Sequence, residues 1–336
     1  MDKNELNEQM IIRREKLDFY SSNNVNPYAN GYRPAFTSEN ITSIFDKFSK
    51  EELDEKKNHV SIAGRIMTKR GQGKAGFATC RDFHGEMQVY VAQANISDLE
   101  FDIWNKVDLG DILYFEGEVM KTKVGALAVR VLKLVVLSKS LRPLPEKFHG
   151  LTDKEERYRR RYVDLIANQD TQKTFIARSN IISGIRDYLN KLDYLEVETP
   201  ILQTMPGGAA AEPFVTHHNT LDMKMYLRIA PELYLKKLVV GGLPRVYEIG
   251  KQFRNEGMSV KHNPEFTSIE LYAMFEDMEG MMEITETIIK DACISVNDTL
   301  HIKYEELDID LTTFKRIHMV DMIKEVTGVD FFVIED

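Results

Sequence analysis

The chain has 336 residues, 43% hydrophobic and 29% charged, which allows two globular domains with a large core. Its 44 basic and 53 acidic residues give a net charge of −9, which excludes binding of nucleic acid through overall charge and leaves only local basic patches. Cys80 and Cys293 are far apart in apolar or strand-like surroundings, so neither a disulfide framework nor a zinc site is supported.

The N-terminal segment predicts a charged helix over residues 3–20. Arg13, Arg14 and Lys16 lie there among apolar residues, which is typical either of a solvated surface helix or of an RNA-contacting arm. The opening MDKNELNEQM lacks a long apolar run, so we expect no secretory signal, no membrane span and a cytoplasmic location. We assign residues 1–58 to an N-terminal helical extension.

Residues 59–141 change to short apolar runs separated by turns. Five runs follow in succession, which predicts five strands in a small barrel: VSIAGRIM, GFATCRDF, MQVYVAQ, DILYFEGEVM and ALAVRVLKLVVL. The segment LRPLPEKFHG then favours extended backbone, because proline restricts itself and its predecessor. We therefore expect a linker over 142–150 and a second domain over 151–336.

The second domain begins with an arginine cluster and a long periodic segment. Apolar residues recur at helical spacing between Thr174 and Leu192, which predicts an amphipathic helix. The run YLEVETP that follows favours a strand ending at Pro200. Any helix packed on a sheet would show the same period, so this pair alone indicates little about function.

Arg245 to Tyr272 reads as two strands around a polar loop. At the two-residue period of a strand, Glu248, Gln252 and Arg254 share one face. Phe266, Ser268, Glu270 and Tyr272 share a face of the returning strand. The hairpin therefore predicts one surface that gathers cations, carboxylates and rings, as a nucleotide-handling site requires.

The segment RVYEIGKQFRNEGMSVKHNPEFTSIELY resembles motif 2 of the class II aminoacyl-tRNA synthetases, and FRNEG, VKHNPEFT and ELY look like the lysine-specific branch. The resemblance extends from about residue 10 to about residue 295, through NPYANGYRP, PGGAAAEPFVTHHN and YLRIAPELYLKKLVVGG. It implies an α+β chain, with an OB-fold anticodon-binding barrel followed by an antiparallel-sheet catalytic domain. The helix and strand before Pro200 look like motif 1, which implies a homodimer.

Activation of an amino acid by ATP needs positioning and charge stabilisation rather than a protein nucleophile. Arg254 suits the α-phosphate, because a guanidinium makes forked, charge-assisted hydrogen bonds. Glu256 suits the adenine amine and Phe266 suits stacking on the base. His262 and Asn263 complete the loop, and the histidine resembles the position that meets the outer phosphates. Singly, these residues would more often be a surface ion pair, a core ring and a solvated histidine.

A pocket for lysine must supply carboxylates for its ammonium groups. Glu232 and Glu270 are the candidates, and the resemblance implies that Glu232 contacts the α-amino group and Glu270 the bound substrate. It also implies that Gly208 and Tyr272 line the pocket. A plain flexible turn is the alternative for Gly208, although a close backbone approach to a ligand also requires glycine.

In the barrel, Arg70, Phe77 and Gln88 match positions at which the family reads the anticodon, by stacking for Phe77 and hydrogen bonding for the other two. Ordinary barrel core is the alternative for Phe77. Relatives often have glutamate where Ala126 stands, so we expect the readout of one anticodon base to differ here.

No segment after the hairpin resembles motif 3, so the sequence looks like a synthetase that ends before that motif. The resemblance implies use of ATP and Mg²⁺, with the magnesium ligands beyond Asp336 and no metal ligand in this chain. We therefore expect ATP-dependent attachment of lysine to its transfer RNA through a lysyl-adenylate. Two alternatives are an inactive tRNA-binding protein and a relative that transfers lysine to a protein.

Overall fold

The computed structural model describes residues 8–71, 73–145, 151–259 and 261–333. The chain divides into two compact units, Met1–Gln169 and Asp170–Asp336. This division falls later than the expected linker over 142–150, much of which lies outside the described residues. The proposed domain limits therefore stay a prediction.

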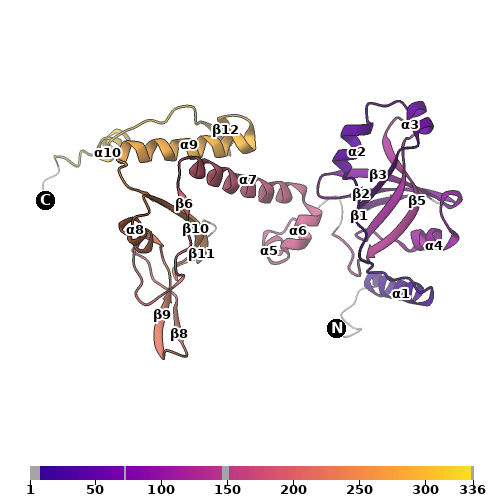
Figure 1. The fold of residues 1–336 in the computed structure, drawn as a ribbon, viewed down its shortest axis with the longest axis horizontal. Coiled ribbons are helices and arrows are strands. Elements are labelled where there is room, and N and C mark those ends of the chain that lie inside the picture. Colours follow the sequence, from indigo (N-terminus) through magenta and orange to yellow (C-terminus); the bar gives the residue numbers. More distant parts are fainter. Residues whose placement is uncertain (1–7, 72, 146–150, 260, 334–336) are drawn as a thin grey trace. The chain divides into compact units, whose positions relative to one another are not determined.

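The first unit contains a closed barrel with strand order β1-β2-β3-β5-β4, which confirms the barrel expected from the five apolar runs (Figure 1). Strands β3 and β5 pair in parallel, and the other neighbours are antiparallel. Two pairings close the ring, Gln88 with Ala128 between β3 and β5, and His59 with Glu118 between β1 and β4. The strands are β1 (His59–Arg70), β2 (Ala75–Arg81), β3 (Glu86–Ala92), β4 (Ile112–Lys121) and β5 (Leu127–Ser138).

Helix α4 (Asp98–Lys106), between β3 and β4, was not predicted. It begins at a capping box in which Ser97 accepts from the backbone of Glu100 and Glu100 accepts from that of Ser97. Phe101 and Trp104 bury its apolar side in the barrel cluster. The other helices of the unit are α1 (Glu8–Ser22), α2 (Ser38–Phe45), α3 (Lys50–Lys56), the 3₁₀ turn η2 (Gln93–Asn95), α5 (Lys154–Arg159) and α6 (Arg161–Ala167).

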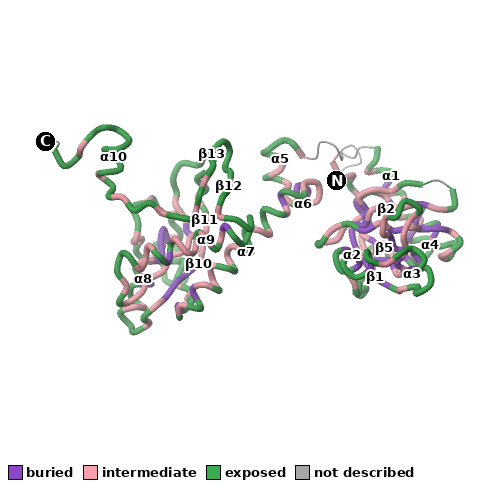
Figure 2. Tube along the Cα trace, turned by 90° about the horizontal axis from the view of Figure 1, so that it is seen from above, coloured by how far each residue is buried: buried purple, intermediate pink, exposed green. Residues whose placement is uncertain are grey.

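The interior of the barrel is continuously apolar, and its inward residues follow the strand period, as in β2 and β3. Figure 2 shows the buried residues gathered inside this unit. Gly117 of β4 sits where strands approach closely, because a Cβ there would collide with the carbonyl oxygen of Arg130. A side chain at this position would therefore force the two strands apart, so glycine favours closure of the barrel.

A buried ion cluster holds α1 against one end of the barrel. Lys139 and Asp111 are fully buried, with Nζ and Oδ2 2.7 Å apart, and Lys16 of α1 lies 2.5 Å from Asp108. Burial raises the pKa of Asp108, but hydrogen bonds from Lys139 and Lys16 outweigh it and lower that pKa overall. Arg13 donates to three backbone carbonyl oxygens at the same end. Two of the three N-terminal cations thus hold the helix in place.

The second unit is built on a sheet of order β11-β10-β6, formed by β6 (Leu195–Glu196), β10 (Arg245–Phe253) and β11 (Glu265–Ala273). Helices α7 (Gln169–Lys191) and α9 (Met278–Asn297) lie along one side of it in Figure 1. Leu189, Tyr247 and Ile284 form the buried cluster between these helices and the sheet. The predicted helix, strand and hairpin are all present, although β6 has only two residues.

The remaining elements of the second unit surround this sheet. None of the helices in the described ranges is long and apolar enough to span a membrane. A second small sheet has the order β7-β9-β8, and β12 pairs with β13. These elements are β7 (Leu202–Gln203), β8 (Val215–His218), β9 (Met223–Leu227), α8 (Glu232–Val240), β12 (His301–Tyr304), β13 (Leu307–Asp310) and α10 (Met319–Thr327).

Candidate active site and candidate nucleic-acid interface

The hairpin β10–β11 has two chemically different faces. Its odd-numbered residues, such as Tyr247 and Ile249, pack toward α7 and α9. Its antiparallel register sets Glu248 opposite Glu270 and Gln252 opposite Phe266. Directly opposite residues share a face, so the predicted polar and aromatic surface exists on the side away from the two helices.

The floor of this surface is a buried ion pair. Arg228, at 2% exposure, donates to Glu248, to the carbonyl oxygen and hydroxyl of Thr199, and to the carbonyl oxygen of Lys251. The hydroxyl of Thr199 also donates to Glu248, at 2.7 Å. The Arg228 guanidinium occupies the space above Gly250, where any side chain would meet it. Glu248 is therefore committed to the protein itself, which leaves Glu270 as the carboxylate of this pair open to a ligand.

Glu270 belongs to the cluster predicted for lysine. The hydroxyl of Tyr272 donates to it at 3.1 Å, and Glu232 is near enough to act on its charge. Gly208 has φ +88° and its missing Cβ would lie 3.0 Å from the Cβ of Glu232. The structure thus brings together the four residues predicted to line the lysine pocket; their roles in binding stay a prediction.

Burial is the main electrostatic influence on this cluster. It raises the pKa of Glu270, with a further rise from Glu232 and an opposing effect of the Tyr272 hydrogen bond. Burial, together with Glu270, also raises the pKa of Tyr272. Lys236, which the sequence reasoning did not single out, places its ammonium 2.6 Å from Glu232 and 5.8 Å from the centre of the Tyr272 ring. The surroundings therefore favour an added cation.

A pocket of about 270 Å³ lies at the loop end of the hairpin. Arg254 holds its guanidinium 5.2 Å from the centre of the Phe266 ring, a cation–π arrangement. All five residues predicted to bind ATP line this pocket, and Lys261 is a further cation that was missed although it lies in the same loop. The lining is Arg254, Glu256, Gly257, Lys261, His262, Asn263, Pro264 and Phe266.

Internal hydrogen bonds shape the loop. His262 Nδ1 lies 2.7 Å from the hydroxyl of Ser259, and the backbones of these residues bond in both directions. Glu256 accepts from the backbone N–H of Glu212 at 3.2 Å, while Asn255 donates to the carbonyl oxygen of Glu212. The segment carrying Glu212 is thereby fastened across the loop.

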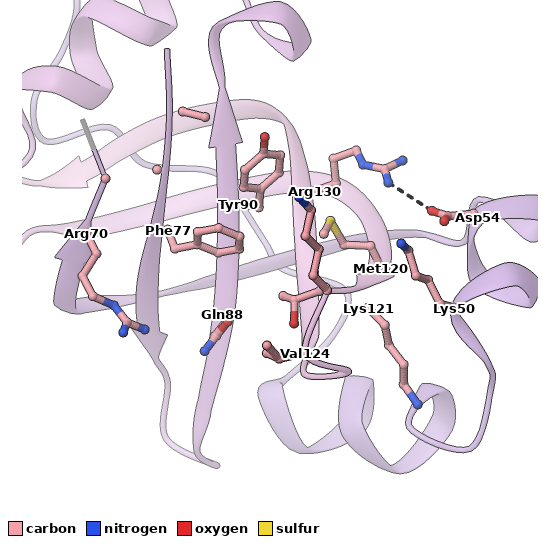
Figure 3. Close-up of a pocket in the computed structure, with 15 residues that line it drawn as sticks. Lys50, Asp54, Arg70, Phe77, Gln88, Tyr90, Met120, Lys121, Val124 and Arg130 are labelled. Atoms are coloured by element: carbon pink, nitrogen blue, oxygen red, sulfur yellow. Dashed lines mark hydrogen bonds and ion pairs between the residues drawn. The ribbon is translucent and has the colours of Figure 1, made fainter. Parts of the chain in front are cut away.

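A second pocket, of about 910 Å³, lies on the outside of the barrel (Figure 3). Arg70, Phe77 and Gln88, predicted to read the anticodon, all line it. The Phe77 and Tyr90 ring centres are 4.8 Å apart, so two rings are available for stacking. Phe77 is therefore a partly exposed pocket residue rather than barrel core.

Strand pairing explains how the pocket is assembled. Arg70, Phe77, Tyr90 and Arg130 are successive partners across β1, β2, β3 and β5 and form a row on the outer face. Tyr90 could have been found from the sequence, because it lies two residues after Gln88 on the same face of β3. Further cations lining the pocket, contributed by α3, β4, its loop and β5, are Lys50, Lys121, Lys123 and Arg130.

Two further details concern the surroundings of this pocket. Arg130 is paired with Asp54 at 3.0 Å (Figure 3). It is also paired with Glu118 at 3.3 Å, so part of its charge is already balanced. Ala126 closes the adjoining turn, because its N–H donates to the Thr122 hydroxyl and its carbonyl oxygen accepts from the Thr122 backbone N–H. Its effect on base readout remains a prediction.

Among the described residues, no group of three or more His, Cys, Asp or Glu side chains is arranged to hold a metal ion. Cys80 and Cys293 are both buried free thiols. Adjacent His217 and His218 make separate contacts, with Asp222 and with the backbone of Leu221.

Comparison with known proteins identifies the family of each of the two regions. Residues 153–331 match the family model described as tRNA synthetases class II (D, K and N), and residues 60–137 match that of the OB-fold nucleic acid binding domain. The chain is 52% identical over 331 residues to a lysine–tRNA ligase of Staphylococcus epidermidis, and 50% identical over 333 residues to one of Bacillus cytotoxicus.

These alignments cover 98% and 99% of this chain and 67% of each relative. A lysine–tRNA ligase of Staphylococcus aureus is 50% identical over 334 residues, with 98% of this chain and 68% of the relative covered. The chain thus spans about two thirds of the length of these relatives. On the family match and these identities together, the chain belongs to the class II tRNA synthetases (D, K and N) and carries their OB-fold domain.

Proposed function

We propose that this chain serves the ATP-dependent attachment of lysine to its transfer RNA through a lysyl-adenylate. One observation carries the proposal: a cluster of carboxylates suited to ammonium groups and an arginine–aromatic pocket suited to a nucleotide share one face of one hairpin. Glu270 and Phe266 are four residues apart on β11, about 13 Å along a strand. An amino acid and ATP bound at these two places would meet between them.

The chemistry requires alignment more than a protein nucleophile, because the amino acid's own carboxylate attacks the α-phosphorus and pyrophosphate leaves. Arg254 would balance the charge that develops on the phosphate oxygens. Glu232 and Glu270 would hold the ammonium groups, and Phe266 would stack on adenine with Glu256 at its amine. His262 and Asn263 would face the outer phosphates.

Selectivity for lysine would follow from the carboxylates. A site that buries them for a cation rejects an uncharged analogue strongly, because the carboxylates would then stay unpaired. Mg²⁺ is expected with ATP, but the described residues offer it no ligand set, so we assign it no residue and no step.

The barrel pocket would bind the anticodon of lysine transfer RNA. Stacking on Phe77, with hydrogen bonds from Gln88 and Arg70, suits splayed single-stranded bases. The cations around it suit the backbone phosphates, which compensates locally for the acidic overall charge.

We further propose a homodimer through the motif 1 region and a cytoplasmic location. Leu195 and Ile201, next to α7 in sequence, are 51% and 43% exposed, which suits a covered surface in an assembly. Sedimentation equilibrium of the chain at increasing concentrations tests the assembly. A dimer with a micromolar Kd would form at protein concentrations on the order of 100 μM, so a chain that stays monomeric there would contradict the proposal.

The test of function is lysine-dependent ATP–pyrophosphate exchange, measured on the 336-residue chain and on a version extended to the length of its relatives, with binding of lysine transfer RNA measured in parallel. We expect the extended version to catalyse exchange with lysine and not with aspartate or asparagine, and the 336-residue chain to catalyse little or none. Absence of exchange in both versions with retained binding of the transfer RNA would favour the non-catalytic RNA-binding alternative, which the ligase names of the relatives do not support. Transfer of lysine to a protein would be favoured only if the transfer RNA does not bind.

A further inference from the structure

Arg254 lies on the ring that the nucleotide needs. Its guanidinium rests over Phe266, 5.2 Å from the ring centre, and that ring is the proposed platform for adenine. Its Nε atom is buried and has no hydrogen-bond partner among the described residues. Buried donors are normally paired, so the Nε–H of Arg254 is an exception that calls for a partner.

The side chain of Gln252 offers an acceptor that also lacks a hydrogen-bond partner. It is only 2% exposed, and neither Oε1 nor Nε2 has a partner among the described residues. It precedes Arg254 by two positions on the same face and is paired across the hairpin with Phe266. An acceptor and a donor that both lack partners therefore lie one strand repeat apart, beside the same ring.

Two nearby carboxylates are already engaged. Glu248 accepts from Arg228 and Thr199, and Glu265 is 3.0 Å from Lys251. Arg228 itself bonds to Thr199, Glu248 and Lys251. Among the described residues of this face, the buried acceptors without a partner are Gln252 Oε1 and the Ser268 hydroxyl, and Gln252 is the one that lies a single strand repeat from Arg254.

We propose that Gln252 is a positioning residue for Arg254. When a nucleotide base covers Phe266, the guanidinium leaves the ring, its Nε–H donates to Oε1 of Gln252, and the two terminal nitrogens turn toward the α-phosphate. A hydrogen bond at Nε fixes the plane of the guanidinium fork, which is what bidentate binding of phosphate requires. This inference rests on the proposed function, since it needs a phosphate at Arg254.

A double-mutant cycle tests the coupling. Gln252→Leu removes the acceptor, Gln252→Met does so at similar length, and Arg254→Lys removes the Nε–H while keeping a positive charge. The readout is the Kd of the 336-residue chain for ATP in the absence of lysine, with the thermal midpoint of the free protein as a check on folding. Ser268→Ala is the matched control, because its hydroxyl also lacks a partner on this face but lies opposite Gly250.

We expect Gln252→Leu and Gln252→Met each to weaken ATP binding about tenfold when Arg254 is present, because a hydrogen bond to a charged group is lost. In the Arg254→Lys background the same substitutions should weaken ATP binding less than about twofold. The thermal midpoint of the free protein should not fall, because the amide is unpaired there. Equal effects in both backgrounds, or no effect at all, overturn the inference alone. No ATP binding by the unmutated chain overturns the proposed function and the inference with it.

Discussion

The barrel unit and the hairpin unit differ in the size of their apolar clusters and in where their buried polar groups lie. Among the described residues, 23 buried side chains form the apolar cluster of the barrel, against four in the cluster of the second unit. The barrel keeps its ligand-facing row on the outside of this apolar interior. The second unit instead buries a charged pair, Arg228 and Glu248, on its ligand-facing side. Function and stability should therefore be separable in the barrel and coupled in the hairpin unit.

The largest effect should come from breaking the ion pair under the hairpin. Glu248→Ala leaves Arg228 buried without its carboxylate, and removal of one partner from a buried pair costs about 3–5 kcal/mol. We expect the second unit to unfold at a much lower urea concentration while the unfolding transition of the barrel stays unchanged. Each transition is monitored with its own probe, such as the fluorescence of Trp104 for the barrel.

The matched control is the exposed pair Lys315–Glu325, 68% and 60% exposed. Glu325→Ala should cost less than about 1 kcal/mol. Equal losses for the two substitutions would contradict the coupling of buried charge to stability in this unit.

Next comes the carboxylate at the proposed lysine site. Glu270→Gln should weaken lysine binding about 30-fold or more at neutral pH, because a buried charge pair loses one partner. Isothermal titration calorimetry of the chain with lysine measures this. Binding to the unmutated chain should strengthen as pH rises through the raised pKa of Glu270, since only the carboxylate form attracts the ammonium.

Stability of the free protein should respond in the opposite direction. Burial raises the pKa of Glu270, so its favourable contribution is complete below the ordinary carboxyl pKa and is lost as pH rises through the raised one. Glu270→Gln should therefore stabilise the free protein at neutral pH and not in acid. A stability difference independent of pH would contradict this assignment.

The third prediction concerns the close approach of β4 and β5 of the barrel at Gly117. Gly117→Ala places a methyl group against the carbonyl oxygen of Arg130 and should cost about 1–3 kcal/mol. Its control is Gly184, within α7, where an added Cβ meets nothing and alanine should stabilise by about 0.5–1 kcal/mol. Urea titration of both variants checks the opposite signs, and a neutral Gly117→Ala would argue against the tight strand crossing.

The smallest expected effect separates binding from stability. Phe77→Ala should weaken binding of the lysine anticodon stem-loop about 5- to 100-fold, as for loss of one stacking platform. The barrel midpoint should change little, because Phe77 faces the pocket and not the core. Phe83→Ala, at a 65% exposed ring outside the pocket, is the control. A parallel loss of stability would place Phe77 in the core instead.

Local patterns predicted much of what lies within one strand or one hairpin. Alternation alone identified the hairpin faces, and the register then set Glu248 opposite Glu270. The same rule would have added Tyr90. Helix α4 was missed because its nine residues read as a charged segment between two strands, although the capping box at Ser97 and Glu100 was legible.

Partners from distant segments were beyond local patterns. Arg228 precedes Glu248 by 20 residues and reaches it only because the end of β9 lies beside β10. Lys50 enters the barrel pocket from a helix before the first strand. The unpaired state of Gln252 likewise depends on which neighbours surround it, and no strand period reveals that.

The parallel pairing of β3 with β5 sets an order of events during synthesis. The β1–β2–β3 meander can form from neighbouring segments, but its two outer edges stay open until β4 and β5 are made. Closure joins Gln88 to Ala128 and His59 to Glu118, so it involves large loop entropies and is slow relative to hairpin formation. We expect the nascent chain to expose two aggregation-prone strand edges with unpaired backbone groups until Ser138 has left the ribosome. In that interval it should need protection by chaperones.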